Sequence, residues 1–399
     1  MITDFDIQSH DLYVNGPPFE RFDDLRREHP VFRHQGVNER EIEWFWALTR
    51  HADIVNVSRQ WQTFSSGREG ALMMAERPEM ELARMLIDMD PPEHSRLRGL
   101  VDRGFTPKAI RLLTEHYVEV THQLIDEAIA AGETEFVTAV ASELPLIAIT
   151  EMLGIPHEDR RKVFDWSNRM IGATDPDYSG GIDDAAEAAE ELYLYASSLA
   201  GDRRQNPRDD IISILVSDHD GDVLSEHEFN VFVLLLSVAG NETTRNAISH
   251  GLLAMIENPD QWDLLRSDPG LVNSAVEEML RWATPVNTFR RTAQNDVELH
   301  GEQIKEGDSV VMYYASANRD PEVFEDPYRF DITRSPNPHI AFGGGGPHFC
   351  LGASLARLEM RTLFGELARR CERVELAGEV HRLRNAFING IKTLPVRLS

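Results

Sequence analysis

Cysteine is almost absent from this chain: its 399 residues include only Cys350 and Cys371. Two cysteines do not build a disulfide framework, so a reducing compartment, the cytoplasm, is expected. Basic residues are also few, since 40 Lys and Arg stand against 67 Asp and Glu and leave a net charge of −27. Nucleic acids and acidic membranes attract positive surfaces, so this balance argues against both as general partners. The negative net charge is still compatible with a local basic patch that binds a small acidic protein.

Long hydrophobic runs are missing as well. The most apolar stretch, VFVLLLSVAG at 231–240, has about half of the ~20 residues that a membrane span needs. The N-terminal stretch MITDFDIQSHDLYVNGPPFE is acidic and has no apolar segment of the kind found in signal peptides. Neither a membrane span nor a secretion signal is therefore expected.

The remaining composition, 42% apolar and 27% charged, is typical of a globular protein with a core large enough to enclose a cofactor. Helical patterns dominate. The longest begins with a capping box, Ser225 and Glu228, and ends at Asn258, which precedes a proline. It predicts a helix of about 33 residues, roughly 50 Å long. Its first half is apolar nearly all round and is therefore expected to be buried.

The rest of the chain shows shorter helical patterns and a few β-like runs. We predict one mainly α domain, residues 1–399, with a smaller β-rich region assembled from both ends of the chain. The stretch 172–184, GATDPDYSGGIDD, is rich in Gly, Asp and Pro and predicts a loop. The other predicted helices are 108–131, 142–153, 184–201, 271–283 and 352–371; the predicted strands lie in VFRHQ, EWFWALT, VELHGEQIKEGDSVVMYY and TLPVRL.

The segment FGGGGPHFCLG, Phe342 to Gly352, places four glycines shortly before a cysteine. Glycine lets the backbone adopt positive φ and approach a flat ligand closely. A helical pattern follows Cys350, so its sulfur is expected at a helix N-terminus, where N–H groups and the helix dipole stabilise a thiolate. Such a thiolate suits a soft metal, including the iron of heme.

Other interpretations of this loop are less favourable or stay open. A dinucleotide-binding loop requires G-x-G-x-x-G, and the third glycine is missing at the required spacing. A zinc site needs more ligands than His348 and Cys350 supply locally. A structural turn beside an inert cysteine stays open on the loop alone.

The loop resembles the heme-binding signature of the cytochrome P-450 superfamily, F-x-x-G-x-H-x-C-x-G. Phe342 lies eight residues before Cys350, one more than in the commonest form, and some bacterial subfamilies share this longer loop. The resemblance runs from FWALTRHADI at 45–54 to FINGIKTLPVRL at 387–398. It implies a P-450 fold with the long central helix over a buried heme b (iron protoporphyrin IX), Cys350 as the iron ligand, and Phe342 and Gly352 against the cofactor.

Two further motifs are weak signals alone and become informative together with the cysteine loop. Glu278 and Arg281 stand at i and i+3, a spacing that arises freely on solvated helices. The resemblance implies that they form a structural Glu-Arg-Arg cluster with Arg329 of DPYRF. In AGNETT, within the long helix, Gly240 costs about 1 kcal/mol relative to Ala. From the residues alone, a close helix contact and threonines bonded to backbone carbonyls explain this motif equally well.

The resemblance gives AGNETT a catalytic role instead. It implies Glu242 as a proton-relay acid, Thr243 as the hydroxyl beside bound O2, and Ala239 and Gly240 against the cofactor, with Gly240 widening the helix groove. Buried heme propionates need cations. The resemblance assigns them His94, Arg98, Arg291 and His348.

The resemblance also implies a heme monooxygenase that inserts one atom of O2 into a C–H bond of a small hydrophobic substrate. The longer cysteine loop, TFSS at 63–66 and FINGIK favour subfamilies that hydroxylate sterols, terpenoids or branched lipids; aromatic hydrocarbons and fatty acids stay as alternatives. An apolar pocket is expected. Its expected lining residues are Leu72, Met73, Met74, Leu235, Val238, Val286, Asn287, Phe289, Ile388 and Ile391.

Electrons are expected from a ferredoxin and its reductase, since no flavin or iron–sulfur segment is visible in the sequence. Arg103, Lys108, Arg357 and Arg361 flank the two proximal helices and are candidates for a basic docking patch, although scattered surface charges explain each equally well. Two other classes stay open. A peroxide-driven peroxygenase or a non-catalytic heme protein does not need the Glu242–Thr243 pair, so that pair counts against both.

Overall fold

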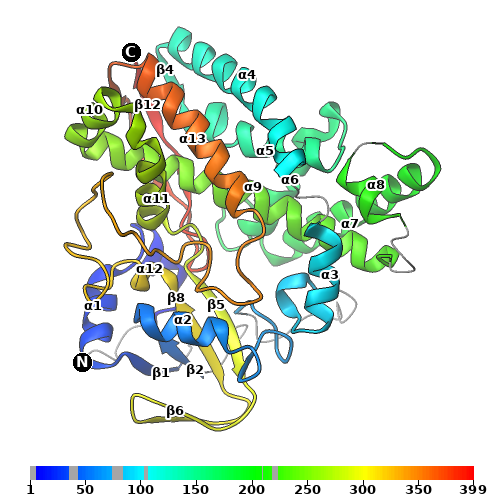
Figure 1. Ribbon diagram of the computed structural model, residues 1–399, viewed down its shortest axis with the longest axis vertical. Coiled ribbons are helices and arrows are strands. Elements are labelled where there is room, and N and C mark those ends of the chain that lie inside the picture. Colours follow the sequence, from blue (N-terminus) through cyan, green and yellow to red (C-terminus); the bar gives the residue numbers. More distant parts are fainter. Residues whose placement is uncertain (1–5, 36–43, 74–83, 103–106, 209, 218–222) are drawn as a thin grey trace.

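The longest helix, α9 (Glu226–Glu257), extends through the helical part of the molecule in the computed structural model, which describes residues 6–35, 44–73, 84–102, 107–208, 210–217 and 223–399 (Figure 1). Its capping box is formed as predicted: the Glu228 N–H donates to Ser225 Oγ at 3.2 Å, and the Ser225 N–H donates to Glu228 Oε2 at 2.8 Å. Its last turns are almost entirely buried. The predicted boundaries of this helix are confirmed, but its first half is only partly buried, because Leu235 and Val238 keep some accessible surface and Ala239 is exposed.

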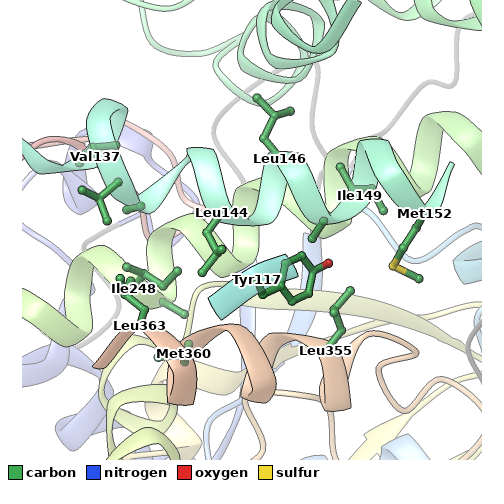
Figure 2. Close-up of a cluster of buried hydrophobic side chains, with 14 of the residues drawn as sticks. Tyr117, Val137, Leu144, Leu146, Ile149, Met152, Ile248, Leu355, Met360 and Leu363 are labelled. Atoms are coloured by element: carbon green, nitrogen blue, oxygen red, sulfur yellow. The ribbon is translucent and has the colours of Figure 1, made fainter. Parts of the chain in front are cut away.

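The helices around α9 form one large apolar core. Helices α5 (Glu143–Met152), α11 (Val272–Ala283) and α13 (Ala353–Arg370) contact α9, and α4 (Pro107–Ala131) lies against α13 and α5. Figure 2 shows the ring of Tyr117, from α4, among apolar side chains of α5 and α13. This layer fixes α13, and with it the loop that carries Cys350.

A second region is built from strands. The five-stranded sheet has the order β1-β2-β8-β5-β3, in which β2 and β8 are parallel and the other neighbours antiparallel. Helix α2 (His51–Arg59) lies beside this sheet (Figure 1). The strands are β1 (Val31–Gln35), β2 (Trp44–Leu48), β3 (Phe64–Ser65), β5 (Thr288–Ala293) and β8 (Ser309–Tyr313), with the hairpin β6 (Val297–Leu299) and β7 (Glu302–Ile304) nearby in sequence.

The C-terminal strands do not join this sheet, contrary to the prediction of one β-rich region from both ends of the chain. Strand β12 (Pro395–Leu398) pairs instead with β4 (Glu133–Glu135) and β9 (Val374–Leu376), beside the helical layer. A separate two-stranded ribbon joins β10 (His381–Arg382) to β11 (Ile391–Thr393).

All the predicted helices are present, and the sequence patterns missed several others. Helix α7 (Ile182–Gln205) begins inside the predicted loop 172–184, because Asp183 and Asp184 occupy its first turn, where acidic residues are favourable. Helix α3 (Glu93–Asp102) begins directly after Pro92, as the i, i+4 spacing of His94 and Arg98 predicted. The helices without a prediction are α1 (Phe19–Glu28), α2, α6 (Arg160–Ile171), α8 (Ile211–Leu215), α10 (Pro259–Ser267) and α12 (Tyr314–Ala317). Within the described part of the chain, we find no helix with the length and apolarity of a membrane span.

Candidate active site

The glycines of the cysteine loop have two structural causes. Gly343, Gly345 and Gly346 have φ values of +96°, +95° and +76°, which residues with side chains rarely adopt. A Cβ on Gly344 would lie 2.7 Å from Ser58 Oγ, and one on Gly346 would lie 2.4 Å from the Ser58 carbonyl oxygen. At Gly344 and Gly346 the backbone therefore also approaches α2 closely.

Cys350 lies at the end of this loop, just before α13. Its N–H donates to the Phe342 carbonyl at 3.0 Å, which closes the loop. The thiol is accessible, yet the surrounding protein desolvates it and so raises its pKa. The backbone N–H groups of Gly352 and Ala353 hydrogen-bond to the sulfur and oppose that rise, as expected at a helix N-terminus. An accessible sulfur inside a desolvating shell is suited to a ligand that binds in a recess.

The four residues predicted to hold propionates come together around the same loop. The rings of His94 and His348 lie 4.5 Å apart, and Arg98 Nη1 donates to the Phe349 carbonyl at 3.0 Å. Burial, together with the nearby Arg291, His94 and Arg98, lowers the pKa of His348 to about 2. The buried Nε2 of His348 has no hydrogen-bond partner among the described residues. The guanidinium groups of Arg98 and Arg291 beside this histidine favour an anion nearby.

The middle of α9 has an accessible stripe within an otherwise buried helix. Leu235, Val238, Ala239 and Thr243 all present accessible surface, Ala239 most of all. Their spacing of three to four residues places them along one side of the helix. The Thr243 hydroxyl donates to the Ala239 carbonyl at 2.7 Å. Its oxygen therefore keeps lone pairs that can accept a hydrogen bond from a bound molecule.

Glu242 is buried beside this stripe and forms an ion pair with Arg245, one turn later. Burial raises the pKa of the Glu242 carboxyl, and Arg245 opposes the rise. Arg245 also donates through Nη1 to Asn168 Oδ1 of α6 at 2.7 Å. A buried acid with a raised pKa is one that can exchange protons with neighbouring groups.

Gly240 serves the packing of α9 against α5. A Cβ at this position would lie 3.1 Å from Ile149 Cδ1, a contact close enough that the Ile149 side chain would have to move by a few tenths of an ångström. The structure thus shows the close helix contact that the residues alone suggested for this glycine.

The Glu-Arg-Arg cluster is formed with a different third residue. Glu278 and Arg281 are fully buried, with Arg281 Nη2 to Glu278 Oε1 at 2.7 Å and Nε to Oε2 at 2.8 Å. Arg334 Nε completes the group at 3.2 Å from Oε2. The side chain of Arg329 is exposed, and this residue contributes its carbonyl oxygen, which accepts from Arg281 and Arg334. The assignment of Arg329 was therefore wrong in its side-chain role.

The predicted substrate residues divide into two groups. Leu72, Met73, Leu235, Val238, Val286 and Phe289 keep some accessible surface, whereas Met74 lies outside the described residues. Asn287, Ile388 and Ile391 are buried, contrary to the prediction that they line a pocket. Asn287 is held by backbone bonds, since its N–H donates to the Phe387 carbonyl and its own carbonyl accepts from Tyr314.

The predicted basic docking patch is only partly described. Arg103 and the side chain of Lys108 lie outside the described residues. Arg357 forms a bidentate pair with Glu277, both N–O distances being 2.7 Å, and its guanidinium lies 4.4 Å from the centre of the Phe342 ring. Arg361 approaches the same carboxylate at 3.7 Å. Both arginines are thus partly neutralised by Glu277.

A family model described as Cytochrome P450 matches residues 186–388, and relatives match nearly the whole chain. The Steroid C26-monooxygenase of Rhodococcus jostii (strain RHA1) is 45% identical over 401 residues, which cover 98% of this chain and 84% of the relative. The chain belongs to the cytochrome P450 family. The predicted monooxygenase class is thereby confirmed, with its heme iron, O2 and redox partner.

This P450 is also similar to a second relative and to a solved P450 structure. The Methyl-branched lipid omega-hydroxylase of Mycobacterium tuberculosis (strain ATCC 25618 / H37Rv) is 43% identical over 390 residues, 95% of this chain and 90% of the relative. The structure of Mycobacterium marinum cytochrome P450 CYP268A2 in complex with pseudoionone superposes with a TM-score of 0.90 at 42% identity, covering 95% of this chain and 94% of that one. The predicted P450 fold is confirmed.

The site of this P450 fits a heme on its own chemistry. Cys350 offers an accessible sulfur that receives two backbone N–H groups, which is the donor that a thiolate-ligated iron requires. The unpartnered Nε2 of His348, with the cationic side chains of Arg291 and Arg98 nearby, offers a place for a carboxylate.

Three functional groups were missed at the sequence level. Arg245 stands three residues after Glu242, an i, i+3 pair that the sequence could have revealed. Arg334 lies in an irregular segment without any periodic spacing to Glu278, so no local signal points to it. Glu277, the partner of Arg357, is 80 residues away from it in sequence.

Proposed function

We propose that this P450 hydroxylates an alkyl chain of a steroid or of a methyl-branched lipid. The observation that carries the proposal is its similarity to two relatives with those names, at 45% and 43% identity over 98% and 95% of this chain. A steroid side chain and a methyl-branched lipid share a branched aliphatic end, so one apolar recess accommodates either.

The surface of α9 supports an aliphatic substrate. Leu235, Val238 and Ala239 are accessible and apolar, and they adjoin the Thr243 hydroxyl on the same stripe. Apolar contacts recognise a hydrocarbon mostly by its shape, with few polar groups to orient it. Val286 and Phe289, on a different segment, extend the apolar accessible surface that we assign to the substrate.

In the proposal, Cys350 holds the iron of heme b, while His94, Arg98, Arg291 and His348 hold the propionates. When bound, this cofactor supplies the activation of O2 by which one oxygen atom enters a C–H bond and the other leaves as water. Arg98 already lies against the cysteine loop through its bond to Phe349. The loop itself is fixed by α2 and by the Cys350–Phe342 hydrogen bond, so the sulfur is presented from a preorganised backbone.

Glu242 and Thr243 are the proposed proton carriers. Glu242 is buried with a raised pKa, so it can hold a proton near neutral pH more readily than an exposed carboxyl. Thr243 donates to the Ala239 carbonyl and can accept a hydrogen bond at its oxygen. The pair thereby conducts protons toward the accessible stripe.

The remaining parts of the proposal concern the protein as a whole. Residues 1–399 act as one domain, supported by site residues that come from positions as distant as His94 and Cys350. Electrons come from a ferredoxin and its reductase, and the enzyme works in the cytoplasm, where its two cysteines stay free thiols.

Substrate class is tested with the heme-loaded enzyme by a ligand-induced spectral screen. A sterol with a branched side chain and a methyl-branched fatty acid should each give a type I shift; a linear fatty acid and a polycyclic aromatic hydrocarbon serve as comparison ligands. Turnover with reduced ferredoxin should then place the hydroxyl on the branched chain, as read by mass spectrometry. Shifts and products with the linear or aromatic compounds alone would refute the proposed substrate class.

The cofactor assignment has its own matched pair of variants. Cys350→Ser should abolish the red-shifted Soret band of the reduced CO complex, whereas Cys371→Ser should keep it, because Cys371 is buried at the end of α13. Thr243→Ala should release more peroxide per electron consumed. Full turnover with peroxide and none with reduced ferredoxin would overturn the proposed electron supply.

A further inference from the structure

A small apolar cavity lies between α3 and the first turns of α9, outside the site described above. Its volume is about 10 Å³, close to the ~10–15 Å³ that a single water-sized molecule needs. Its apolar lining consists of Leu86, Leu97, Val101, Leu224, Val231 and Phe232, none of which is more than 9% exposed. A cavity with such a lining stays dry and takes an apolar guest such as xenon. We call it the α3–α9 cavity.

The two polar residues at the rim of this cavity are engaged elsewhere. Arg84 Nη2 donates to the Gly67 carbonyl at 2.9 Å, and the Glu228 carboxylate pairs with Arg96 of α3. None of the described lining residues has a buried polar atom that lacks a hydrogen-bond partner. A polar guest would therefore lose its hydrogen bonds to water on entry without gaining new ones, whereas an apolar guest loses none.

The cavity continues the accessible stripe of α9 toward the N-terminal end of that helix. Val231 lines the cavity, and Leu235 of the stripe stands four residues later, on the same side of the helix. From Val231 to Thr243, the hydroxyl at the other end of the stripe, is a rise of roughly 18 Å at 1.5 Å per residue. One helix thus carries the cavity wall, the apolar stripe and the Thr243 hydroxyl.

Helix α3 connects the cavity with the cofactor site in a similar way. Leu97 and Val101, at i and i+4, line the cavity. His94 and Arg98, each three residues before one of them, are the residues that we assign to the propionates. The same short helix therefore borders both the cavity and the proposed cofactor site.

We propose that the α3–α9 cavity is a holding site for a small apolar gas, O2 in the working enzyme, from which the gas moves along the α9 stripe toward the iron. O2 is apolar and only slightly larger than water, so it matches both the lining and the size of the cavity. Entry of an apolar ligand into a preformed, dry pocket requires no displacement of ordered water. The inference needs O2 as a substrate, which follows from the P450 family, and does not depend on the proposed steroid or lipid.

Xenon tests the holding site directly, because it enters the same kind of cavity and scatters strongly. Crystals of the heme-loaded enzyme under xenon pressure should show an anomalous peak between α3 and α9. Val231→Phe should lose this peak because the ring fills the cavity, whereas Val231→Ala should strengthen it. A wild-type cavity that stays empty under xenon, or that contains ordered water, overturns the proposal.

Flash photolysis of the reduced CO complex tests the supply of gas to the iron. Part of the released CO should wait in the cavity and rebind in a phase whose rate does not depend on CO concentration. Xenon pressure and Val231→Phe should each remove this phase. Its absence from the wild-type enzyme, or its persistence under both treatments, refutes the supply role.

Val223→Phe is the matched control. It adds the same ring at a position that is 42% exposed, next to the lining residue Leu224. This variant should keep both the xenon peak and the rebinding phase. Leu97→Phe fills the cavity from α3 and gives a second variant if Val231→Phe does not fold.

A type I titration distinguishes a gas from the hydrocarbon substrate as the guest of the cavity. Wild type and Val231→Phe should bind a branched lipid with the same affinity, because the gas site lies apart from the substrate. Clearly weaker binding by Val231→Phe, with Val223→Phe unchanged, would mean that the cavity holds part of the substrate and would overturn the gas site. A wild-type enzyme that hydroxylates neither steroid nor branched lipid refutes the proposed function instead, and the xenon peak stays as expected.

Discussion

The buried cluster contains the side chain of Arg334 and not that of Arg329. The variants Arg334→Gln and Arg329→Gln should therefore differ in their effect on stability. Arg334 is 10% exposed, and its guanidinium contacts the fully buried Glu278 carboxylate. It also donates to the carbonyls of Glu325, at 2.6 Å, and Asp326, at 3.2 Å. Arg329 places its side chain at the surface, so its removal touches none of these contacts.

The expected magnitudes differ by several-fold. Removing one partner of a buried ion pair costs about 3–5 kcal/mol, and Glu278 keeps Arg281, so we expect about 3 kcal/mol for Arg334→Gln. A chain of 399 residues has an unfolding entropy of roughly 0.8 kcal/mol per degree, so this loss lowers the melting temperature by about 4 °C. Arg329→Gln, an exposed substitution, should cost less than about 0.5 kcal/mol, or less than about 1 °C.

Urea and thermal unfolding of the heme-loaded enzyme, followed by circular dichroism, measures both variants. A double-mutant cycle with Glu278→Gln should give a coupling of at least about 1 kcal/mol to Arg334 and nothing measurable to Arg329. Equal losses for the two arginines, or a larger coupling to Arg329, would show that the original sequence assignment was right and that the contacts described above do not govern stability.

Three other substitutions have expected outcomes. Burial raises the pKa of Glu359 from 4.5 to about 8, so its contribution to stability is lost as pH rises from 4.5 through 8; Glu359→Gln should flatten that decline in melting temperature. Glu277 is the opposite case: burial raises its pKa, but its cationic partners lower the value to about 2. Its stabilisation, present above pH 4.5, is lost as pH falls toward 2, and acid titration of Glu277→Gln should show a weaker loss. Gly346→Ala meets the Ser58 carbonyl at 2.4 Å, so it should reduce heme incorporation in an absorbance titration, whereas Gly132→Ala, with similar φ and free space, should not.

The sequence predicted best those features that are local or that bear a specific motif. The capping box at Ser225 and the cysteine loop each depend on neighbours in sequence, and both were placed correctly. The third member of the buried cluster was placed wrongly, because Arg329 and Arg334 differ only in how an irregular segment turns. Pairing of β12 with β4 was equally inaccessible, since strand partners distant in sequence leave no local pattern.

In the active site, too, motif residues were predicted correctly and contacts between distant segments were not. The resemblance assigned His94 and His348 to the same propionate site, and the structure brings their rings within 4.5 Å of each other. The burial of Ile388 and Ile391 was not predicted, because apolar residues of a core and of a pocket look alike in sequence. Arg357 illustrates the same limit for charge, since its pairing with Glu277 depends on the contact between α11 and α13.

The contact between α2 and the cysteine loop has a practical consequence for how this enzyme unfolds. Ser58 lies almost three hundred residues before Cys350 in sequence, yet it abuts the glycines that set the position of the sulfur. The Soret spectrum of the thiolate complex is therefore an optical reporter of whether the sheet region is docked. Partial detachment of that region should change the spectrum while circular dichroism, dominated by the helices, still reads as native. The delay between the two signals during denaturation measures how independently the sheet region and the helical core come apart.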